Sequence, residues 1–204
     1  MSTVKKGMIT MSKGNTKLAK SILIWSLPAV LTCPNCNDCK TSCYARKAEG
    51  IYPQVLPCRT KNWQASKNSS FVEDMIFLIS RTWKNARKPM QAVRIHESGD
   101  FYDQAYVDAW VKIARNLPDI PFYGYSKAWD HVDLTELNSL PNVNIVRSVT
   151  PDNRINFGTL QDMKAMCKEY KGKLCPYGLA KKLPACGTEC KHCLNQEYVF
   201  FIKH

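Results

Sequence analysis

Cysteine is the residue type in this sequence whose number and spacing most clearly indicate chemistry. Four of the ten cysteines form the run Cys33-Pro-Asn-Cys36-Asn-Asp-Cys39-Lys-Thr-Ser-Cys43, a C-x2-C-x2-C-x3-C pattern. Bacterial ferredoxins bind iron–sulfur clusters with this spacing, because short spacers let one loop surround a cluster with thiolates. The run therefore predicts an iron–sulfur cluster, of the 4Fe-4S type, with Cys33, Cys36, Cys39 and Cys43 as ligands.

A second group of four cysteines lies near the end of the sequence. Its members, in the pattern C-x10-C-x3-C-x2-C, are Cys175, Cys186, Cys190 and Cys193. This spacing suits a second iron–sulfur cluster, but four cysteines with short spacers bind structural zinc equally well. We therefore expect one or two clusters, with zinc as the alternative at the second site. Cys58 and Cys167 are predicted to be buried as small apolar residues and not to bind metal.

The rest of the composition is that of an ordinary folded protein with a strong positive charge. The 204 residues are 45% hydrophobic and 23% charged, which argues against a disordered tail, a coiled coil or a collagen-like repeat. Twenty-nine Lys and Arg against 17 Asp and Glu give a formal charge of +12, which favours a nucleic acid or nucleotide as partner. Two four-thiolate sites would lower the working charge to roughly +8.

Many of the cations lie in the stretch that follows the first cysteine run, with Trp63 and Trp83 among them. Such a surface could follow a phosphate backbone while the aromatic rings stack on bases. The alternative, which the sequence leaves open, is a solvated basic face with both tryptophans in the core. The basic residues are Arg46, Lys47, Arg59, Lys61, Lys67, Arg81, Lys84, Arg87 and Lys88.

The sequence before the first cysteine bears on whether the thiols are free or paired in disulfides. Lysines precede the apolar stretch from Ile22 to Leu31, but Trp25, Ser26 and Pro28 interrupt it and no small-x-small cleavage site follows. No apolar run reaches the roughly 18 residues that a membrane-spanning helix needs. We therefore expect no membrane association, a cytoplasmic location and reduced thiols.

The hydrophobic pattern predicts the elements that would position these residues. Strands are expected at residues 21–27, 92–96, 121–125, 143–149 and 198–202. Two helical pieces separated near Pro53 and Pro57 are expected after the first cysteine run. Further helices are expected from a Ser70–Glu73 capping box to Pro89, from Asp103 to Leu117, and after Asp133. This alternation predicts βαβ units and a parallel sheet.

We expect a single domain over residues 1–204. It would comprise a peripheral basic N-terminus at residues 1–18, a βα core at residues 19–150 and a cysteine-rich C-terminal segment at residues 151–204 with a last strand.

Polar residues follow the predicted strands where ligands of parallel sheets bind, beyond the carboxyl ends. Strand alternation places Arg94, His96 and Ser98 on one face. A buried arginine or histidine in a strand must be hydrogen-bonded or paired. We predict Arg94, His96 and Asp100 as candidate catalytic residues, and a structural polar network is the alternative. Asp100 could be a catalytic acid, a ligand acceptor or the N-terminal carboxylate of the next helix.

Together these motifs resemble the phage gene product 88 family. The resemblance is carried by Cys39-x3-Cys43-Tyr44-Ala45, Arg94-Ile-His96-Glu-Ser98-Gly99-Asp100-Phe101-Tyr102, Phe122-Tyr-Gly-Tyr125-Ser-Lys127 and the late Cys-Pro with its cysteine triplet. It implies a phage protein with an iron–sulfur-like arrangement of cysteines.

The layout is also similar, more distantly, to a shortened radical S-adenosylmethionine (SAM) enzyme. This likeness implies an α/β fold, a parallel-sheet partial barrel with cysteine-rich metal-binding loops. Ser98, Gly99, Asp100 and Lys127 would then bind SAM, with Gly99 allowing close backbone approach. The expected function is an iron–sulfur phage protein with SAM-type or redox chemistry. The alternative is a zinc-stabilised nucleic-acid-binding protein without catalysis.

Overall fold

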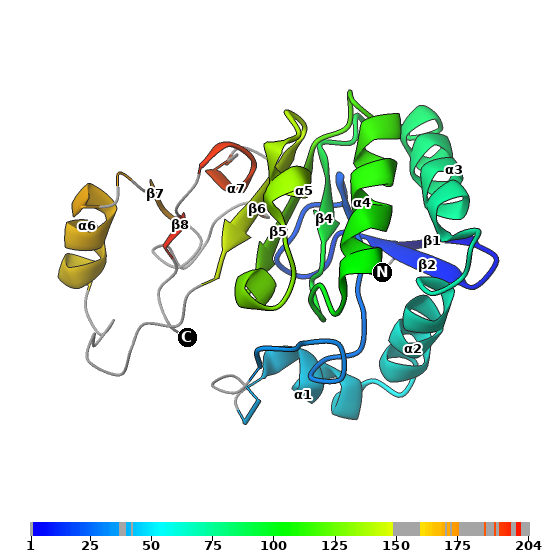
Figure 1. Cartoon of the computed structure of the whole chain (residues 1–204), viewed down its shortest axis with the longest axis horizontal. Helices are drawn as coiled ribbons and strands as arrows, with labels where there is room; N and C mark the ends of the chain where they lie inside the picture. The colour runs from blue at the N-terminus through cyan, green and yellow to red at the C-terminus, as the bar shows by residue number, and fades with distance from the viewer. Residues whose placement is uncertain are drawn as a thin grey trace.

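The computed structural model (Figure 1) describes residues 2–36, 40–41, 43–148, 160–169, 171, 173–175, 186, 190, 192–196 and 199–200. The elements in chain order are β1 (Ser2–Lys6), β2 (Ile9–Lys13), β3 (Ile22–Ile24), α1 (Tyr44–Ile51), α2 (Val55–Ala65), α3 (Phe71–Lys84), β4 (Ala92–Ile95), α4 (Gln104–Asn116), β5 (Phe122–Ser126), the 3-10 turn η1 (Ala128–Asp130), α5 (Thr135–Ser139), β6 (Val143–Arg147), α6 (Leu160–Glu169), β7 (Lys173–Leu174), α7 (His192–Asn195) and β8 (Val199–Phe200). None of the described helices is long and apolar enough to cross a membrane.

Six strands form one open sheet in the order β1-β2-β3-β4-β5-β6. Neighbours from β3 to β6 are parallel, whereas β1 and β2 extend the sheet with antiparallel pairings. The two edges, β1 and β6, do not pair with each other, so the sheet is not closed. The α/β class is confirmed, but the sheet is mixed instead of wholly parallel and gives no support to a radical-SAM-like barrel.

The prediction of a peripheral N-terminus at residues 1–18 is wrong. Strands β1 and β2 form a hairpin that turns at Gly7, where φ is +56°. Ile9 and Met11 on β2 are almost completely buried in the main core. The lysines of this segment obscured a short apolar alternation, because Lys5, Lys6 and Lys13 stay at least partly exposed while Ile9 and Met11 point inward.

The main core lies between the sheet and the helices that precede and follow β4, and Figure 1 shows α4 in front of the strands with α3 beside it. Trp25 after β3 packs against Phe71 of α3 and Trp110 of α4, with ring centroids 5.7 and 6.4 Å apart. Large aromatic rings of this kind dominate the free energy of a buried core. This packing fixes the distance between β4 and the start of α4, where several predicted site residues lie.

The predicted helix starts are confirmed in one case and corrected in another. Asp103 caps α4, since its Oδ1 accepts a hydrogen bond from the Tyr106 backbone N–H at 2.8 Å. The predicted Ser70–Glu73 capping box does not form at α3. Instead the Ser70 hydroxyl donates to Asp74 Oδ2, one turn further along.

Of the C-terminal segment, the described residue Cys186 and helix α7 lie against the other face of the sheet. Cys186 and Leu194 pack there against Ile22, Ala92 and Tyr123 in a second, smaller core. Strand β8 pairs with β7 in a separate two-stranded sheet, so the predicted last strand, seen at Val199–Phe200, does not join the main sheet in the described part of the chain. The C-terminal segment is therefore positioned by contacts with the main sheet's face.

Candidate functional site

Arg94 and His96, predicted to share a face of β4, point in opposite directions. Arg94 faces the C-terminal segment, with its guanidinium 5.7 and 5.0 Å from the ring centroids of Tyr123 and Tyr125. His96 has a left-handed backbone, with φ at +63°. This conformation ends the alternation after Ile95 and turns the imidazole toward α4, so the shared-face prediction is wrong.

The imidazole of His96 belongs to a buried chain of hydrogen bonds. Trp25 Nε1 donates to the Tyr106 hydroxyl at 2.7 Å, and that hydroxyl lies 2.9 Å from His96 Nε2. Because an indole can only donate, the Tyr106 hydrogen is left for His96 Nε2, and the ring proton is assigned to Nδ1. Burial, and then the charge of Arg94, lower the pKa of His96 to about 3. A neutral His96 can accept a hydrogen bond but cannot serve as a proton donor of the imidazolium type.

Asp100 is held by three donors from its own chain. Its Oδ1 accepts hydrogen bonds from the Ser126 hydroxyl at 2.7 Å and the Phe101 N–H at 2.8 Å, and its Oδ2 accepts one from the Lys127 N–H at 2.8 Å. Burial raises the pKa of Asp100, while these hydrogen bonds act in the opposite direction. The carboxylate thus joins the loop after β4 to the end of β5, and a part in binding a cofactor stays a prediction.

Gly99 allows a close approach, but the approaching group is the chain itself. A Cβ atom at Gly99 would lie 2.6 Å from Leu27 Cβ and from Thr32 Oγ1, and φ is +83°. The Leu27 N–H donates to the Ser98 carbonyl, and the Asp100 N–H donates to the Thr32 carbonyl. The segment Ser98-Gly99-Asp100 therefore holds, through backbone hydrogen bonds, the loop that leads into the first cysteine run.

The first cysteine run begins at the carboxyl end of the parallel strands, as the sequence predicts. Asn35 Nδ2 donates to the Lys127 carbonyl at 2.9 Å, which places the segment between Cys33 and Cys36 beside the end of β5. Cys39 lies outside the described residues. The described loops after β3, β4 and β5 thus meet at one edge of the sheet.

The second cysteine group gathers on the opposite face from α4. Cys186, Cys190 and Cys193 line a cavity of about 20 Å³ together with Tyr123 and other neighbours. Burial, and then the nearby thiols of Cys193, Cys175 and Cys190, raise the pKa of Cys186 to about 11. All four predicted ligands therefore lie in one neighbourhood. Within the described ranges, however, no group of three or more His, Cys, Asp or Glu side chains is arranged to hold a metal ion, and none of the nine described cysteines forms a disulfide.

Arg94 supplies the positive charge beside these thiols. Burial acts to lower the pKa of the guanidinium, but the Tyr123, Tyr44 and Tyr125 phenols and the Cys193 thiol raise it and prevail. The Tyr125 hydroxyl donates a hydrogen bond to Cys193 Sγ. Among the described residues, Arg94 forms no ion pair with a carboxylate.

Two contacts fix the C-terminal segment to the sheet. Cys186 bridges to Leu18 as a parallel strand would, with its N–H donating to the Lys17 carbonyl at 2.8 Å. Asn144 on β6 donates to the Cys193 carbonyl at 2.8 Å and to the Gln196 carbonyl at 3.0 Å. These bonds hold Cys186 beside Leu18 and Cys193 beside β6.

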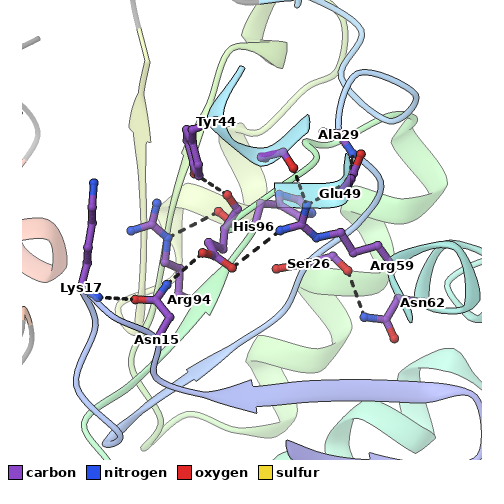
Figure 2. A network of polar contacts seen from close by, with 12 residues as sticks. Asn15, Lys17, Ser26, Ala29, Tyr44, Glu49, Arg59, Asn62, Arg94 and His96 are labelled. Carbon is purple, nitrogen blue, oxygen red and sulfur yellow. Dashed lines mark hydrogen bonds and ion pairs between the residues drawn. The ribbon is translucent and has the colours of Figure 1, made fainter. Parts of the chain in front are cut away.

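A buried ion pair braces the side of the site near α1 and α2 (Figure 2). Arg59 lies 2.9 Å from Glu49, both side chains are 8% exposed, and Arg59 also donates to the Ala45 carbonyl. Glu49 accepts the Ala29 N–H, and Glu97 lies 3.9 Å from Arg59. The prediction that Arg59 belongs to an exposed basic surface is therefore wrong, because its buried side chain joins α2 to α1 and to the loops after β3 and β4.

Other predicted residues have simpler positions. Cys58 and Cys167 are half-buried, so the prediction of full burial is wrong for both. Trp63 and Trp83 are also half-buried and pack against the main core, as the alternative interpretation of the basic stretch expected. The Lys67 ammonium lies 3.7 Å from the Trp63 ring centroid.

Sequence reasoning missed the residues that surround Arg94 and the thiols. Tyr123 and Tyr125 alternate on β5, and Tyr123 is the register partner of Arg94. An alternating pair of tyrosines on the strand next to a strand-borne arginine was the available signal. Asn144 carried no comparable signal, because its partners lie about 50 residues away.

Comparison with known proteins places the chain among phage proteins. The gene product 88 family model matches residues 4–162, a range that ends before the second cysteine group. The Gene 88 proteins of Mycobacterium phages L5 and D29 are each 27% identical to the chain, over 128 and 129 residues. These alignments cover 60% of this chain and 54% and 53% of the two proteins, so the chain spans about half the length of the curated relatives it matches. No solved structure matches. By the extent of the family match, the chain belongs to the gene product 88 family.

Proposed function

We propose that this phage-family protein is a metal–thiolate protein in which Cys175, Cys186, Cys190 and Cys193 bind one metal centre. The observation that carries the proposal is the charge balance around Arg94. The Arg94 guanidinium is partly buried against the rings of Tyr123 and Tyr125, and no described carboxylate pairs with it, so an anion at this position would stabilise its charge. A four-thiolate zinc site or 4Fe-4S cluster carries a net charge of about −2 and would supply that partner.

The size of the cavity bears on which metal this site holds. Three of the four thiols line a cavity of about 20 Å³, which has room for one ion, whereas a four-iron cluster would require the surrounding chain to move apart as well. This observation favours zinc at the C-terminal site, with an iron–sulfur cluster as the alternative. Binding would draw the four thiols into a tetrahedron, because metal binding is coupled to local folding in such sites.

The first cysteine run remains our candidate for a 4Fe-4S cluster. Its support is the C-x2-C-x2-C-x3-C spacing and the position of Cys33 and Cys36 at the carboxyl edge of the sheet. A redox reaction would take place there, and SAM-type chemistry would require one of the four cysteines to leave its iron open. SAM binding is tested by calorimetry on cluster-loaded protein, and the absence of binding would leave a cluster without that reaction.

Metal analysis of protein prepared without oxygen tests both sites. We expect zinc that is lost in Cys186→Ser and Cys193→Ser, and iron with acid-labile sulfide that is lost in Cys36→Ser and Cys43→Ser. Cys58→Ser, a half-buried cysteine outside both groups, is the matched control and should keep all metals. Unchanged metal content in Cys186→Ser and Cys193→Ser would overturn the C-terminal site.

Arg94 gives a second test of the same site. Arg94→Gln removes the charge, and we expect metal affinity to fall by about 10- to 100-fold, as for other groups that support metal ligands. Arg94→Lys keeps the charge and should lose less. Arg115→Gln removes an exposed arginine that pairs with Glu136 and should not change the affinity.

A further inference from the structure

A large groove lies at the end of the sheet opposite the cysteine run, where the parallel strands begin. Its volume is about 620 Å³, within the range of small-ligand sites. Residues just before β4, β5 and β6 line it, together with the end of α7. The lining residues that matter here are Trp83, Gln91, Pro118, Asp119, Asn142 and Asn195.

The lining combines apolar surface with the side-chain amides of Gln91 and Asn195, whereas the Asn142 amide nitrogen already donates to carbonyls of its own chain. The half-buried Trp83, which also packs against the main core, and Pro118 are among the rings that line the groove. Within the described part of the chain, the side-chain amide of Gln91 has no hydrogen-bond partner. Rings for stacking together with amides for hydrogen bonding are what proteins use to bind unpaired bases.

The border of the groove is positively charged. Trp83 and Met90 both line the groove, and the short segment that joins them carries Lys84, Arg87 and Lys88, all exposed. These three cations form no ion pair with any carboxylate that the structure describes. They are therefore available to phosphates that pass along the rim.

We propose that this groove binds single-stranded nucleic acid, with bases against Trp83 and phosphates on Lys84, Arg87 and Lys88. A single strand fits better than a duplex, because only unstacked bases can present their faces to an indole ring. The charge of +12 on the whole chain would attract a polyanion from a distance, and the groove would determine where it binds. This binding does not depend on the metal centre.

Asp119 offers a substitution that should increase the affinity for nucleic acid. It is the one carboxylate among the described residues that line the groove, it is exposed, and it forms no ion pair with them. A carboxylate in the path of a polyanion opposes binding. Asp119→Asn should therefore strengthen binding by about two- to fivefold, whereas damage to the fold would weaken it.

The experiment measures fluorescence anisotropy of a labelled oligothymidine of about 12 nucleotides at about 50 mM salt. The test variant is Lys84→Gln/Arg87→Gln/Lys88→Gln. The matched control is Arg46→Gln/Lys47→Gln/Lys61→Gln, which removes the same charge from exposed positions on α1 and α2.

We expect the affinity of the test variant to fall tenfold or more, and its slope of log affinity against log salt to become about 2 units less steep. The affinity of the control should fall less than about threefold. A duplex of the same length should bind more weakly than the single strand. Equal losses in the two triple variants, no binding by the unchanged chain, or no gain in Asp119→Asn would each overturn the proposal.

Discussion

Asp100 illustrates how a residue chosen for chemistry can serve the fold. Its two oxygens accept three hydrogen bonds that connect the loop after β4 to the end of β5. A carboxylate can accept all three, whereas an asparagine replaces one acceptor with a donor. The position therefore requires an acceptor on both sides of the carboxyl group.

Asp100→Asn should lower the free energy of unfolding by about 1–3 kcal/mol, because it leaves a buried donor without an acceptor. Since burial raises the folded-state pKa of Asp100, its contribution to stability is full at acid pH and declines as pH rises from about 4 through the folded value. Asp100→Asn should remove this decline. Urea denaturation at several pH values measures both effects.

Asp103→Asn is the matched control for this substitution, because asparagine caps a helix about as well as aspartate. A stability loss in Asp103→Asn equal to that in Asp100→Asn would contradict the assignment of Asp100 as the connecting residue.

His96 should make the protein sensitive to acid. Its pKa is lowered to about 3 by burial and by Arg94, while an unfolded histidine titrates near 6.5. The stability that His96 contributes is thus present above about 6.5 and is lost as pH falls toward 3. We expect His96→Asn, which tolerates the left-handed backbone, to be less stable at neutral pH but to lose less on acidification. A parallel pH profile for the two chains, from thermal unfolding, would count against this role.

The identity of the polar site residues was readable from the sequence, but their directions were not. Arg94, His96 and Asp100 stand out because polar side chains are rare in strands and at strand ends of buried sheets. Strand alternation predicted the Arg94 and His96 side chains on one face of the sheet. The positive φ at His96 places them on opposite faces. Histidine is among the non-glycine residues enriched in the left-handed region, but that conformation is uncommon for any of them, so the residue type alone does not predict it at position 96.

At the scale of elements, Asn144 on β6 determines where α7 and Cys193 lie. Its amide donates to two carbonyls at the end of the C-terminal segment. Asn144→Ala should lower the free energy of local unfolding of this segment by about 1–2 kcal/mol. The alkylation rate of Cys193 should then rise several-fold. The control is Asn116→Ala, which removes an exposed hydrogen bond from the Asn116 side-chain amide to the Lys112 carbonyl at the end of α4. An unchanged Cys193 rate in Asn144→Ala would place the anchor elsewhere.

The regular elements of the centre were predictable, and the exceptions have physical causes. The predicted strand at 92–96 and the helix from Asp103 to Leu117 match β4 and α4 closely, because each has a clear period and a capping residue or proline near its ends. The N-terminal hairpin was missed because Ile9 and Met11 are the only buried side chains among those described in it, at residues 5–13. Antiparallel additions to a parallel sheet depend on pairing between distant segments, which local periodicity does not record.

At the scale of the whole molecule, the first cysteine run and the groove occupy different ends of one sheet. The cysteine run begins where the parallel strands end, and the groove lies where they begin. Gln91 and Leu194 line both the groove and the small cavity beside the C-terminal thiols. The two proposed sites therefore share a wall, and variants of these two residues would affect both.

Strand β1 has a consequence for how this chain behaves at high concentration. It forms one edge of the sheet, pairs with β2 over five residues and carries Lys5 and Lys6. Lysines on an edge strand discourage pairing with a strand from another molecule. Without β1, the backbone of β2 would become an unprotected edge beside apolar Ile9 and Met11.

Removal of residues 1–8 should therefore convert a well-behaved chain into one that aggregates, because an open edge is a template for intermolecular β-sheet. We expect light scattering to rise with concentration for the shortened chain, and to rise less for full-length Lys5→Gln/Lys6→Gln. Equal scattering by the shortened and full-length chains would mean that the hairpin contributes packing alone. We therefore expect the lysine-bearing strand β1 to oppose self-assembly of the chain.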